Sequence, residues 1–300
     1  MIKRPEVNMA QLRNNKEKVS LETIDENAEL KRLWNVQLEL LDVIDDVCQR
    51  NKINYSLYAG SLLGAVRNHG FIPWDDDLDI CMSRSDYERF INVWKNEEHP
   101  GYILQNKDNT PLFTQSFTKI RKDHTAFLQY EWEKSRYHTG IFVDIFPIDR
   151  IPDGSLKRKK FFWGCMKYQL YTREFVPPKG STVIKFISEI FLKSTTPNGR
   201  SAYRKRFEER LISYSNHSKW NTVAIETMQT AQQILPADLL DTYTRFEFEH
   251  RQYQCFSKWH EYLSFKYGDY MKLPPENERV WKHHPLIIDY DHNYEDLIHE

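Results

Sequence analysis

The feature that most constrains the fold is the pair Gly60-Ser61, which follows a short β-type segment and precedes a run of apolar residues. The pattern predicts a strand over residues 54–59 and a short helix over residues 61–68. The first N–H groups of a helix lack partners within it, and its positive dipole end attracts anions. Gly60 and Ser61 are therefore predicted to contact phosphate oxygens.

Three aspartates that follow this helix, Asp75, Asp77 and Asp79, are two residues apart. In an extended chain their side chains point to one face. Crowded carboxylates repel one another unless a hard divalent cation neutralises them, and Mg²⁺ (or Mn²⁺) bound by carboxylates and substrate phosphates fits this need. The alternative is an acidic turn after a proline. The apolar strand predicted at residues 78–82 favours the metal site, because unpaired charge is costly there.

These segments carry a resemblance to a known family. Residues 60–67, Gly-Ser-Leu-Leu-Gly-Ala-Val-Arg, and residues 71–79, Phe-Ile-Pro-Trp-Asp-Asp-Asp-Leu-Asp, are similar to the signature of LicD proteins. Residues 139–149 and residues 262–275 match two further segments of the family. The resemblance extends over nearly the whole chain.

The resemblance to the LicD family implies a phosphotransferase of the nucleotidyltransferase fold, related to fukutin and fukutin-related protein. It implies transfer of a phosphorylated alcohol from a CDP-linked donor, with release of CMP. CDP-choline is favoured over CDP-polyols as the donor, and the acceptor is a sugar hydroxyl of a cell-surface glycan, either free or lipid-linked. Phosphocholine would require an aromatic cage for its quaternary ammonium group. Candidate walls of this cage are Trp74, Tyr130, Trp132 and Tyr137.

A further aspartate, Asp144, lies in the apolar strand predicted at residues 141–146. A single Asp in a core strand is more often a hydrogen-bonded structural residue. The resemblance, however, places Asp144 on a strand beside Asp77 and Asp79, which we interpret as the primary metal ligands. Asp144 is then a ligand of a second metal ion or the general base that takes a proton from the acceptor hydroxyl. Asp75 is interpreted as a supporting ligand.

Basic residues near these motifs are candidates for binding the donor. Arg67 lies one helical face from Ser61 and could hold a phosphate through two hydrogen bonds. Lys119 and Arg121 alternate with an isoleucine on a predicted strand, so that both point to one face. For each of the three, the alternative is a solvated surface charge.

Several other polar residues near the motifs receive a weaker interpretation. His69 and His138 flank the motifs and are second-tier candidates for the site. The pair His283-His284 is predicted to be a capping or surface feature, because no ligand partner stands at metal spacing. Asp149 follows a proline beyond the predicted strand and is expected to be a cap.

Composition agrees with a globular enzyme. The chain has 300 residues, of which 40% are hydrophobic and 14% aromatic, and this excludes a disordered chain. The formal net charge of −1 gives no argument for nucleic acid as a partner. The four cysteines show no spacing for zinc or a disulfide framework, so we expect buried thiols in a reducing cytoplasm. Because no apolar run of the required length is present, we expect neither a signal peptide nor a membrane-spanning segment.

We predict an α/β (α+β) fold in three parts. A loose segment covers residues 1–25, a nucleotidyltransferase-like core with a mixed sheet covers residues 26–150, and a mostly helical part covers residues 151–300. The apolar periodicity predicts amphipathic helices over residues 26–49 and 85–95, the second capped by a serine. Further strands of the mixed sheet are predicted at residues 102–105, 114–121, 125–130 and 141–146.

The middle of the chain is strongly basic. Residues 157–206 contain thirteen Lys and Arg but only two acidic residues. Five apolar residues share one predicted helical face: Val183, Phe186, Ile187, Ile190 and Phe191. A basic amphipathic segment can lie on anionic lipid, which predicts peripheral contact with the inner face of the cytoplasmic membrane. The alternative is a helical insertion that packs its apolar face on the catalytic core.

Two other functions are compatible with the same carboxylates. A nucleotidylyltransferase would use a nucleoside triphosphate and release pyrophosphate. A non-catalytic binding protein is disfavoured, because the Gly-Ser pair and the aspartates are all present.

Overall fold

The computed structural model describes residues 26–110, 113–129, 137–176, 181–215, 217, 219–225, 234–283 and 285–297. The predicted loose segment, residues 1–25, lies outside these ranges. The first elements are α2 (Glu26–Arg50), β1 (Ser56–Leu57), α3 (Ala59–Asn68), β2 (Asp79–Ser83), α4 (Arg84–Asn96), β3 (Tyr102–Gln105), β4 (Thr118–Lys122), β5 (Ala126–Leu128) and β6 (Phe142–Arg150). They are followed by α5 (Ser155–Arg173), α6 (Thr182–Ser194), α7 (Pro197–Ser215), β7 (Thr222–Ile225), β8 (Ile234–Pro236), η2 (Ala237–Leu240), β9 (Tyr243–Phe248), β10 (Arg251–Phe256), α8 (Trp259–Tyr267), η3 (Glu276–Glu278), β11 (Ile287–Asp289) and α9 (Tyr294–Leu297).

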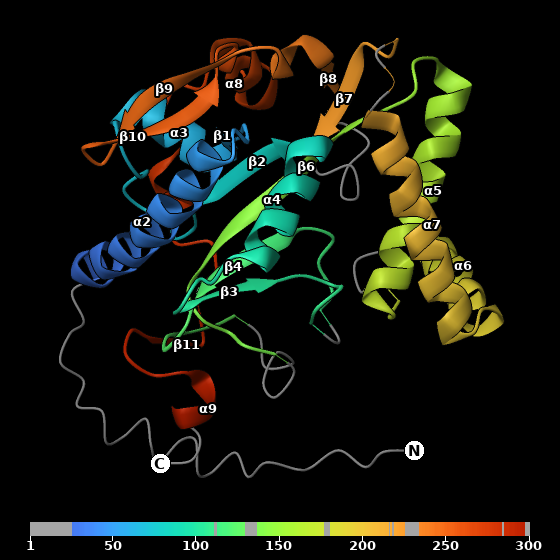
Figure 1. Ribbon diagram of the computed structural model, residues 1–300, viewed down its shortest axis with the longest axis horizontal. Helices are drawn as coiled ribbons and strands as arrows, with labels where there is room; N and C mark the ends of the chain where they lie inside the picture. The colour runs from blue at the N-terminus through green and yellow to red at the C-terminus, as the bar shows by residue number, and fades with distance from the viewer. Residues whose placement is uncertain are drawn as a thin grey trace.

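A mixed sheet of seven strands forms the centre of the molecule (Figure 1). Five strands follow the order β1-β2-β6-β4-β3, while β7 pairs with both β6 and β8. β2 and β6 are parallel, and the other pairs of this sheet are antiparallel. The predicted α/β (α+β) class with a mixed sheet is confirmed. Because β7 and β8 lie within residues 222–236, the sheet continues beyond the boundary predicted at residue 150.

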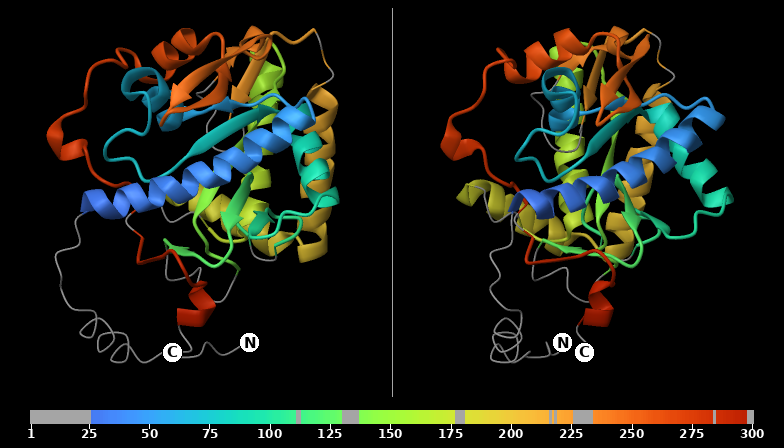
Figure 2. Two further views of the ribbon diagram at one scale, coloured as in Figure 1. Left: turned by 60° about the vertical axis from the view of Figure 1, so that its left-hand side comes forward. Right: turned by 90° about the vertical axis from the view of Figure 1, so that its left-hand side faces the viewer.

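Two helices cover the central strands. α2 packs on β4 and β6, α4 packs on β2 and β6, and the two helices contact each other. On α2, the periodic residues Leu33, Leu40 and Ile44 are fully buried, as the periodicity predicts. α4 begins after Ser83, whose hydroxyl accepts a hydrogen bond from the Asp86 N–H. Figure 2 shows α2, in blue, running alongside the sheet.

The strand predicted at residues 125–130 exists but belongs to a different sheet. β5 pairs antiparallel with β11 in a two-stranded sheet of its own. Its partner comes from residues 287–289, so local periodicity could not reveal the pairing. The strand predicted at residues 114–121 is also shorter at its start, because β4 begins at Thr118.

The prediction that Asp149 is a cap outside the strand is wrong. β6 runs on through Pro147 to Arg150. Pro147 lies between the residues of β6 that pair with β4 and those that pair with β7, where the missing N–H interrupts neither ladder. Asp149 is fully buried and accepts hydrogen bonds from Nε and Nη2 of Arg84 at 2.7 and 2.8 Å. This ion pair connects the end of β6 to the start of α4.

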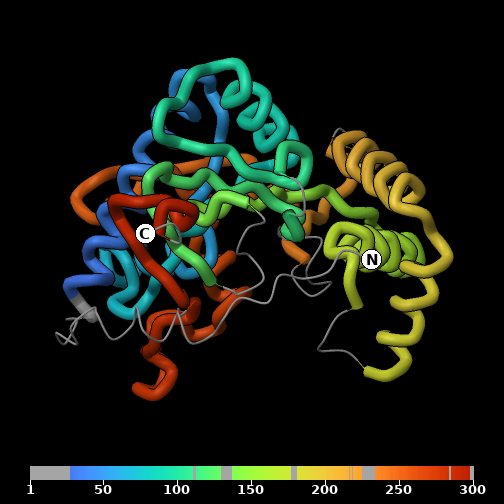
Figure 3. Tube along the Cα trace, turned by 90° about the horizontal axis from the view of Figure 1, so that it is seen from below, coloured from blue at the N-terminus to red at the C-terminus, as the bar shows by residue number. Residues whose placement is uncertain are grey.

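Helices α5, α6 and α7 form a bundle at one side of the sheet (Figures 1 and 3). A small core of its own holds the bundle together, with Phe161, Cys165 and Tyr168 on α5 and Phe207 and Leu211 on α7. α7 also contacts α4 and β6, and α6 packs on α5. The four cysteines of the chain are buried thiols outside any disulfide, as predicted. In the ranges that the structure describes, no helix has the length and apolar character needed to span a bilayer.

Candidate active site

The parallel pair of strands β2 and β6 brings together two of the predicted catalytic aspartates. Asp79, the first residue of β2, is the direct register partner of Asp144. The Asp144 N–H donates to the carbonyl of Leu78 at 3.1 Å. Side chains at paired positions of neighbouring strands share a face of the sheet. The prediction that Asp144 lies on the strand beside Asp79 agrees with this register.

Ser61 connects the start of α3 to these strands. Its hydroxyl accepts a hydrogen bond from the Asp79 N–H at 2.8 Å, and the Tyr58 N–H donates to the Asp79 carbonyl at 2.9 Å. Gly60 lies against Asp75, because a Cβ at residue 60 would come within 2.5 Å of Asp75 Oδ2. The first turn of α3 therefore faces the Asp75 carboxylate. A phosphate placed there would share this turn with another anion.

Asp75 is buried without full compensation. It is only 3% exposed, and within the described residues its Oδ1 has no hydrogen-bond partner. Lys282 Nζ lies 3.7 Å from the same oxygen. Burial and then the negative charge of Asp77 raise the pKa of Asp75 to about 7. An unpartnered carboxylate oxygen next to other carboxylates is the environment that a bound cation would relieve.

The structure adds two residues to the site that the sequence did not predict, Asp76 and His283. Asp76 is fully buried; its Oδ2 accepts the His283 N–H at 2.9 Å, and its Oδ1 lies 3.0 Å from His283 Nδ1. His283 Nδ1 is also 3.8 Å from Asp77 Oδ2. Oxygen and nitrogen atoms of Asp76, Asp77 and His283 all lie within 4.8 Å of one another. The expectation that His283 is a capping or surface feature is therefore wrong, while His284 lies outside the described residues.

His283 is best described as a positive partner of the carboxylates. Burial by itself would lower its pKa, but the hydrogen bond to Asp76 and the negative charge of Asp77 outweigh burial and raise it. The same interaction holds the pKa of Asp76 below its usual value against the effect of burial. Residues 282 and 283 thus place two basic side chains at the acidic cluster. The sequence indicates that a buried Asp in the run of three aspartates needs a hydrogen-bond donor, but it does not show where in the chain that group lies.

Lys119 forms a buried ion pair with Asp144. Its Nζ lies 2.6 Å from Asp144 Oδ1 and 3.3 Å from the ring centroid of Phe142. Burial raises the pKa of Asp144 and lowers that of Lys119, and the charge of each residue opposes the effect on the other. The interpretation of Lys119 as a solvated surface charge is excluded. Whether it contacts a donor stays a prediction.

Arg121 lies on the same face of β4 as Lys119, as predicted, but its side chain is surrounded by other residues of the protein. It is 2% exposed, and its guanidinium donates to Gln105 Oε1 and to the Gly140 carbonyl, both at 2.6 Å. These bonds hold the segment before β6 against β3 and β4. A solvated surface charge is excluded here too, and binding of the donor by Arg121 stays a prediction.

Arg67 connects α3 to the C-terminal motif. Its Nη1 donates to the Tyr270 carbonyl at 3.2 Å, and burial lowers its pKa. Lys266 on α8 donates to the hydroxyl of Tyr58, the N-cap residue of α3, at 3.1 Å. Residues 262–275 therefore pack against the start and end of α3.

The remaining candidates that the structure describes have positions or contacts that shape the fold. His69 ends α3 in the left-handed conformation, with φ of 57°. His138 lies 2.9 Å from Asn293 Oδ1, and burial lowers its pKa. Of the predicted cage residues, Tyr130 and Trp132 lie outside the described ranges. Trp74 has the guanidinium of Arg279 over its ring, and Tyr137 packs edge-on against Phe113.

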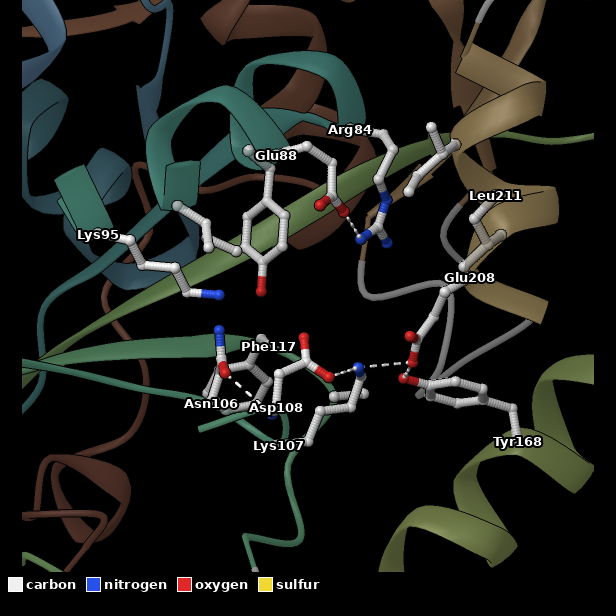
Figure 4. A pocket seen from close by; sticks show the side chains of 14 residues that line it. Arg84, Glu88, Lys95, Asn106, Lys107, Asp108, Phe117, Tyr168, Glu208 and Leu211 are labelled. Atoms are coloured by element: carbon white, nitrogen blue, oxygen red, sulfur yellow. Dashed lines mark hydrogen bonds and ion pairs between the residues drawn. The ribbon is translucent and has the colours of Figure 1, made fainter. Parts of the chain in front are cut away.

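A polar hollow of about 120 Å³ lies between α4 and α7 (Figure 4). Its charges are largely paired with one another: Arg84 with Glu88, and Lys107 with both Asp108 and Glu208. The predicted metal ligands do not line it. We therefore place the candidate active site at the carboxylate cluster.

Comparisons with known proteins identify the family of this chain. Residues 52–187 match the LicD/FKTN/FKRP nucleotidyltransferase domain. The lipopolysaccharide cholinephosphotransferase LicD of Haemophilus influenzae is 32% identical over 264 residues, which cover 83% of this chain and 93% of that protein. Uncharacterised proteins of Rickettsia prowazekii and Rickettsia typhi are 28% and 35% identical over 42% and 40% of this chain, and over 54% and 40% of their own lengths. The chain therefore belongs to the LicD family of phosphotransferases, as its motifs predict.

Proposed function

We propose that this enzyme transfers phosphocholine from CDP-choline to a sugar hydroxyl of a cell-surface glycan and releases CMP, with the help of a divalent cation. The Haemophilus relative, named a lipopolysaccharide cholinephosphotransferase, supports choline phosphate as the transferred group and a glycan as the acceptor. The similarity covers 93% of that relative's length. The donor, the cation and the released nucleotide are our proposals.

The observation that carries the proposal is the meeting of Asp79 and Asp144 across two parallel strands, with the buried Asp75 carboxylate close to the start of α3. Residues that would hold Mg²⁺ (or Mn²⁺) are Asp77 and Asp79, with Asp75 in support. Such a cation would bind the donor phosphates and offset the negative charge that develops on the CMP leaving group. It would also separate those phosphates from Asp75 at the first turn of α3.

Asp144 and Lys119 are suited to proton transfer from the acceptor. A carboxylate whose pKa is raised by burial is a stronger base than an exposed one, and Asp144 has this property. The Lys119 ammonium, 2.6 Å away, keeps the carboxylate ionised and fixes its orientation. We assign to Asp144 the removal of the acceptor hydroxyl proton. The alternative role, ligation of a second cation, uses the same oxygens.

The candidate for holding a donor phosphate is Arg67 on α3, which already donates a hydrogen bond to the Tyr270 carbonyl. Of the two predicted cage walls that the structure describes, Trp74 is favoured over Tyr137, because a cation, the guanidinium of Arg279, already lies 5.6 Å from the centroid of the Trp74 ring. A choline head group would replace or adjoin that guanidinium.

The experiment that tests the proposal is an assay of CMP release from a panel of CDP-alcohols with Mg²⁺, with and without glycan acceptors. We expect CDP-choline to give acceptor-dependent CMP, and EDTA to abolish it. Release from a CDP-polyol alone would move the substrate to polyol phosphates. Pyrophosphate release from a nucleoside triphosphate without CMP would overturn the proposal in favour of a nucleotidylyltransferase.

A further inference from the structure

In the described part of the chain, the apolar face of α6 is largely exposed and does not pack on the catalytic core. Val183 and Phe186 are each 65% exposed, and Ile190 is 49% exposed. α6 packs on α5 instead, at the outer side of the bundle (Figures 1 and 3). On α5 itself, Trp163 is 62% and Met166 50% exposed. Clustered apolar side chains in solvent indicate a surface that another apolar body covers.

These helices enclose a groove of about 430 Å³, within the usual range of roughly 300–1,000 Å³ for small-molecule sites. Its apolar wall combines side chains from α5 and α6, and Tyr203 of α7 adds to it. The apolar lining residues are Trp163, Met166, Leu170, Ile184, Ile187 and Phe191. The exposed side chains of α6 adjoin this groove along the same helix.

The charges around the groove are of one sign. Lys160, Lys167, Arg173 and Arg210 line it, and no acidic residue does so among the described residues. Lys157 and Lys159 are exposed near the N-terminus of α5, as is Lys160. This differs from the hollow between α4 and α7, where basic and acidic side chains form ion pairs with one another. A groove with an apolar floor and a basic edge matches an acyl chain with an anionic head group.

We propose that the α5–α6 groove binds an acyl chain of an anionic phospholipid and thereby docks the enzyme on a membrane surface. A second copy of the chain is a poor occupant, because its identical basic edge would be repelled. An ordinary protein partner would leave the clustered lysines without counter-charges unless it were acidic. An anionic bilayer supplies both the apolar chain and the negative surface. The proposal does not depend on the proposed transfer reaction.

The first test is co-sedimentation of the full chain with phosphatidylcholine vesicles, with and without phosphatidylglycerol. We expect sedimentation with the anionic vesicles only, and release by salt. Changing Lys157, Lys159 and Lys160 to Gln should weaken binding by about fivefold for each lysine that meets the surface. Arg158 is left unchanged, because it donates to the Pro152 carbonyl and to Thr222 within the protein.

A matched control removes the same charge elsewhere. Lys31, Lys52 and Lys95 are exposed and lie outside the bundle. Their replacement by Gln should leave vesicle binding near the wild-type level. Equal losses in the two triple variants would overturn the assignment to the bundle, since they would show only a dependence on net charge. No sedimentation of the wild type at low salt would overturn the proposal altogether.

The second test asks whether a chain enters the groove. Phosphatidylglycerol with brominated acyl chains should quench the fluorescence of Trp163, so the quenched fraction should fall in Trp163→Phe. Phe186→Ser should reduce vesicle binding, whereas Phe265→Ser, 49% exposed on α8, should not. Binding without this quenching would mean electrostatic adsorption alone and overturn the groove assignment. A wild-type dimer that Phe186→Ser dissociates would assign the face to a second copy instead.

Discussion

The carboxylate cluster and the α5–α7 bundle depart from the usual distribution of side chains in opposite ways. In the cluster, charged groups are buried: Asp75 is 3% and Asp144 8% exposed. In the bundle, apolar groups are exposed, and Val183 and Phe186 on α6 each reach 65%. Each departure is unfavourable for an isolated chain, the first through desolvated charge and the second through hydrated apolar surface.

The difference lies in how far each region is compensated from within the chain. The cluster draws partners from distant elements, since Lys119 meets Asp144 and His283 meets Asp76. In the described residues, Oδ1 of Asp75 is buried without a hydrogen-bond partner, although Lys282 Nζ lies 3.7 Å from it. The apolar face of α6 has almost no such compensation. We infer that the cluster needs one small ion to be complete, whereas the bundle needs an extended apolar surface.

The largest effect is expected for the primary ligands. Asp77→Asn and Asp79→Asn should each lower CMP release by several orders of magnitude while the fold is kept, because each removes a charge that holds the cation. The measurement is CMP release at saturating donor, with circular dichroism as the check on folding. Asp46→Asn is the matched control, since Asp46 forms an exposed ion pair with Arg50 on α2. Near-normal turnover in folded ligand variants would contradict the metal assignment.

Asp144→Asn should affect both turnover and stability. Loss of a general base lowers the rate by about 10²–10⁴-fold. Leaving Lys119 buried without a counter-charge should lower the free energy of unfolding by about 3–5 kcal/mol. Urea denaturation measures the second effect separately from CMP release.

A double variant separates the two roles of this ion pair. Lys119→Met combined with Asp144→Leu removes both charges and should recover most of the lost stability, but none of the activity. Wild-type activity in Asp144→Asn would instead show that Asp144 is a structural residue of the core.

A smaller loss of activity is expected for substitutions of Asp76 and His283, because these residues position the proposed metal ligands and do not contact the reacting groups. His283→Gln or Asp76→Asn should reduce activity by about 10–100-fold and raise the Mg²⁺ concentration required. Because the two residues act as a unit, the double variant should lose little more than either single variant. His138→Gln, a histidine bonded to Asn293, serves as the control and should leave the Mg²⁺ requirement unchanged. Additive losses would refute the pairing.

Local patterns predicted the parts of this fold whose partners are close in sequence. The periodicity of α2, a serine cap of α4 at residue 83 or 85, and the strand-like placement of Asp79 were predicted from the spacing of residues close in sequence; the structure has the cap at Ser83. Such spacing indicates which face of an element is buried but not what covers it. The resemblance to the LicD family was needed to relate Asp144 to Asp79.

The parts that could not be predicted depend on distant partners. His283 is 207 residues from Asp76, and Arg84 is 65 residues from Asp149. A buried aspartate needs a hydrogen-bond donor, and the residues next to it in sequence do not identify which residue supplies that hydrogen bond. The pairing of β5 with β11 was not predicted for the same reason. Many short apolar strands have the same alternating pattern, so the pattern does not show which two of them pair.

The smallest change in the free energy of unfolding is expected for substitutions on α6. These substitutions test the bundle's part in the comparison with the carboxylate cluster. Val183→Ser and Phe186→Ser should each change the free energy of unfolding by no more than about 0.5 kcal/mol, because these side chains leave little apolar contact behind. Leu211→Ala, in the core of the same bundle and 1% exposed, should lower it by about 2–5 kcal/mol. CMP release with a water-soluble acceptor should be unchanged in both α6 variants, because α6 lies away from the carboxylates on the outer side of the bundle. A large loss of stability in Phe186→Ser would mean that the chain itself covers this face, and the need for an external apolar surface would disappear.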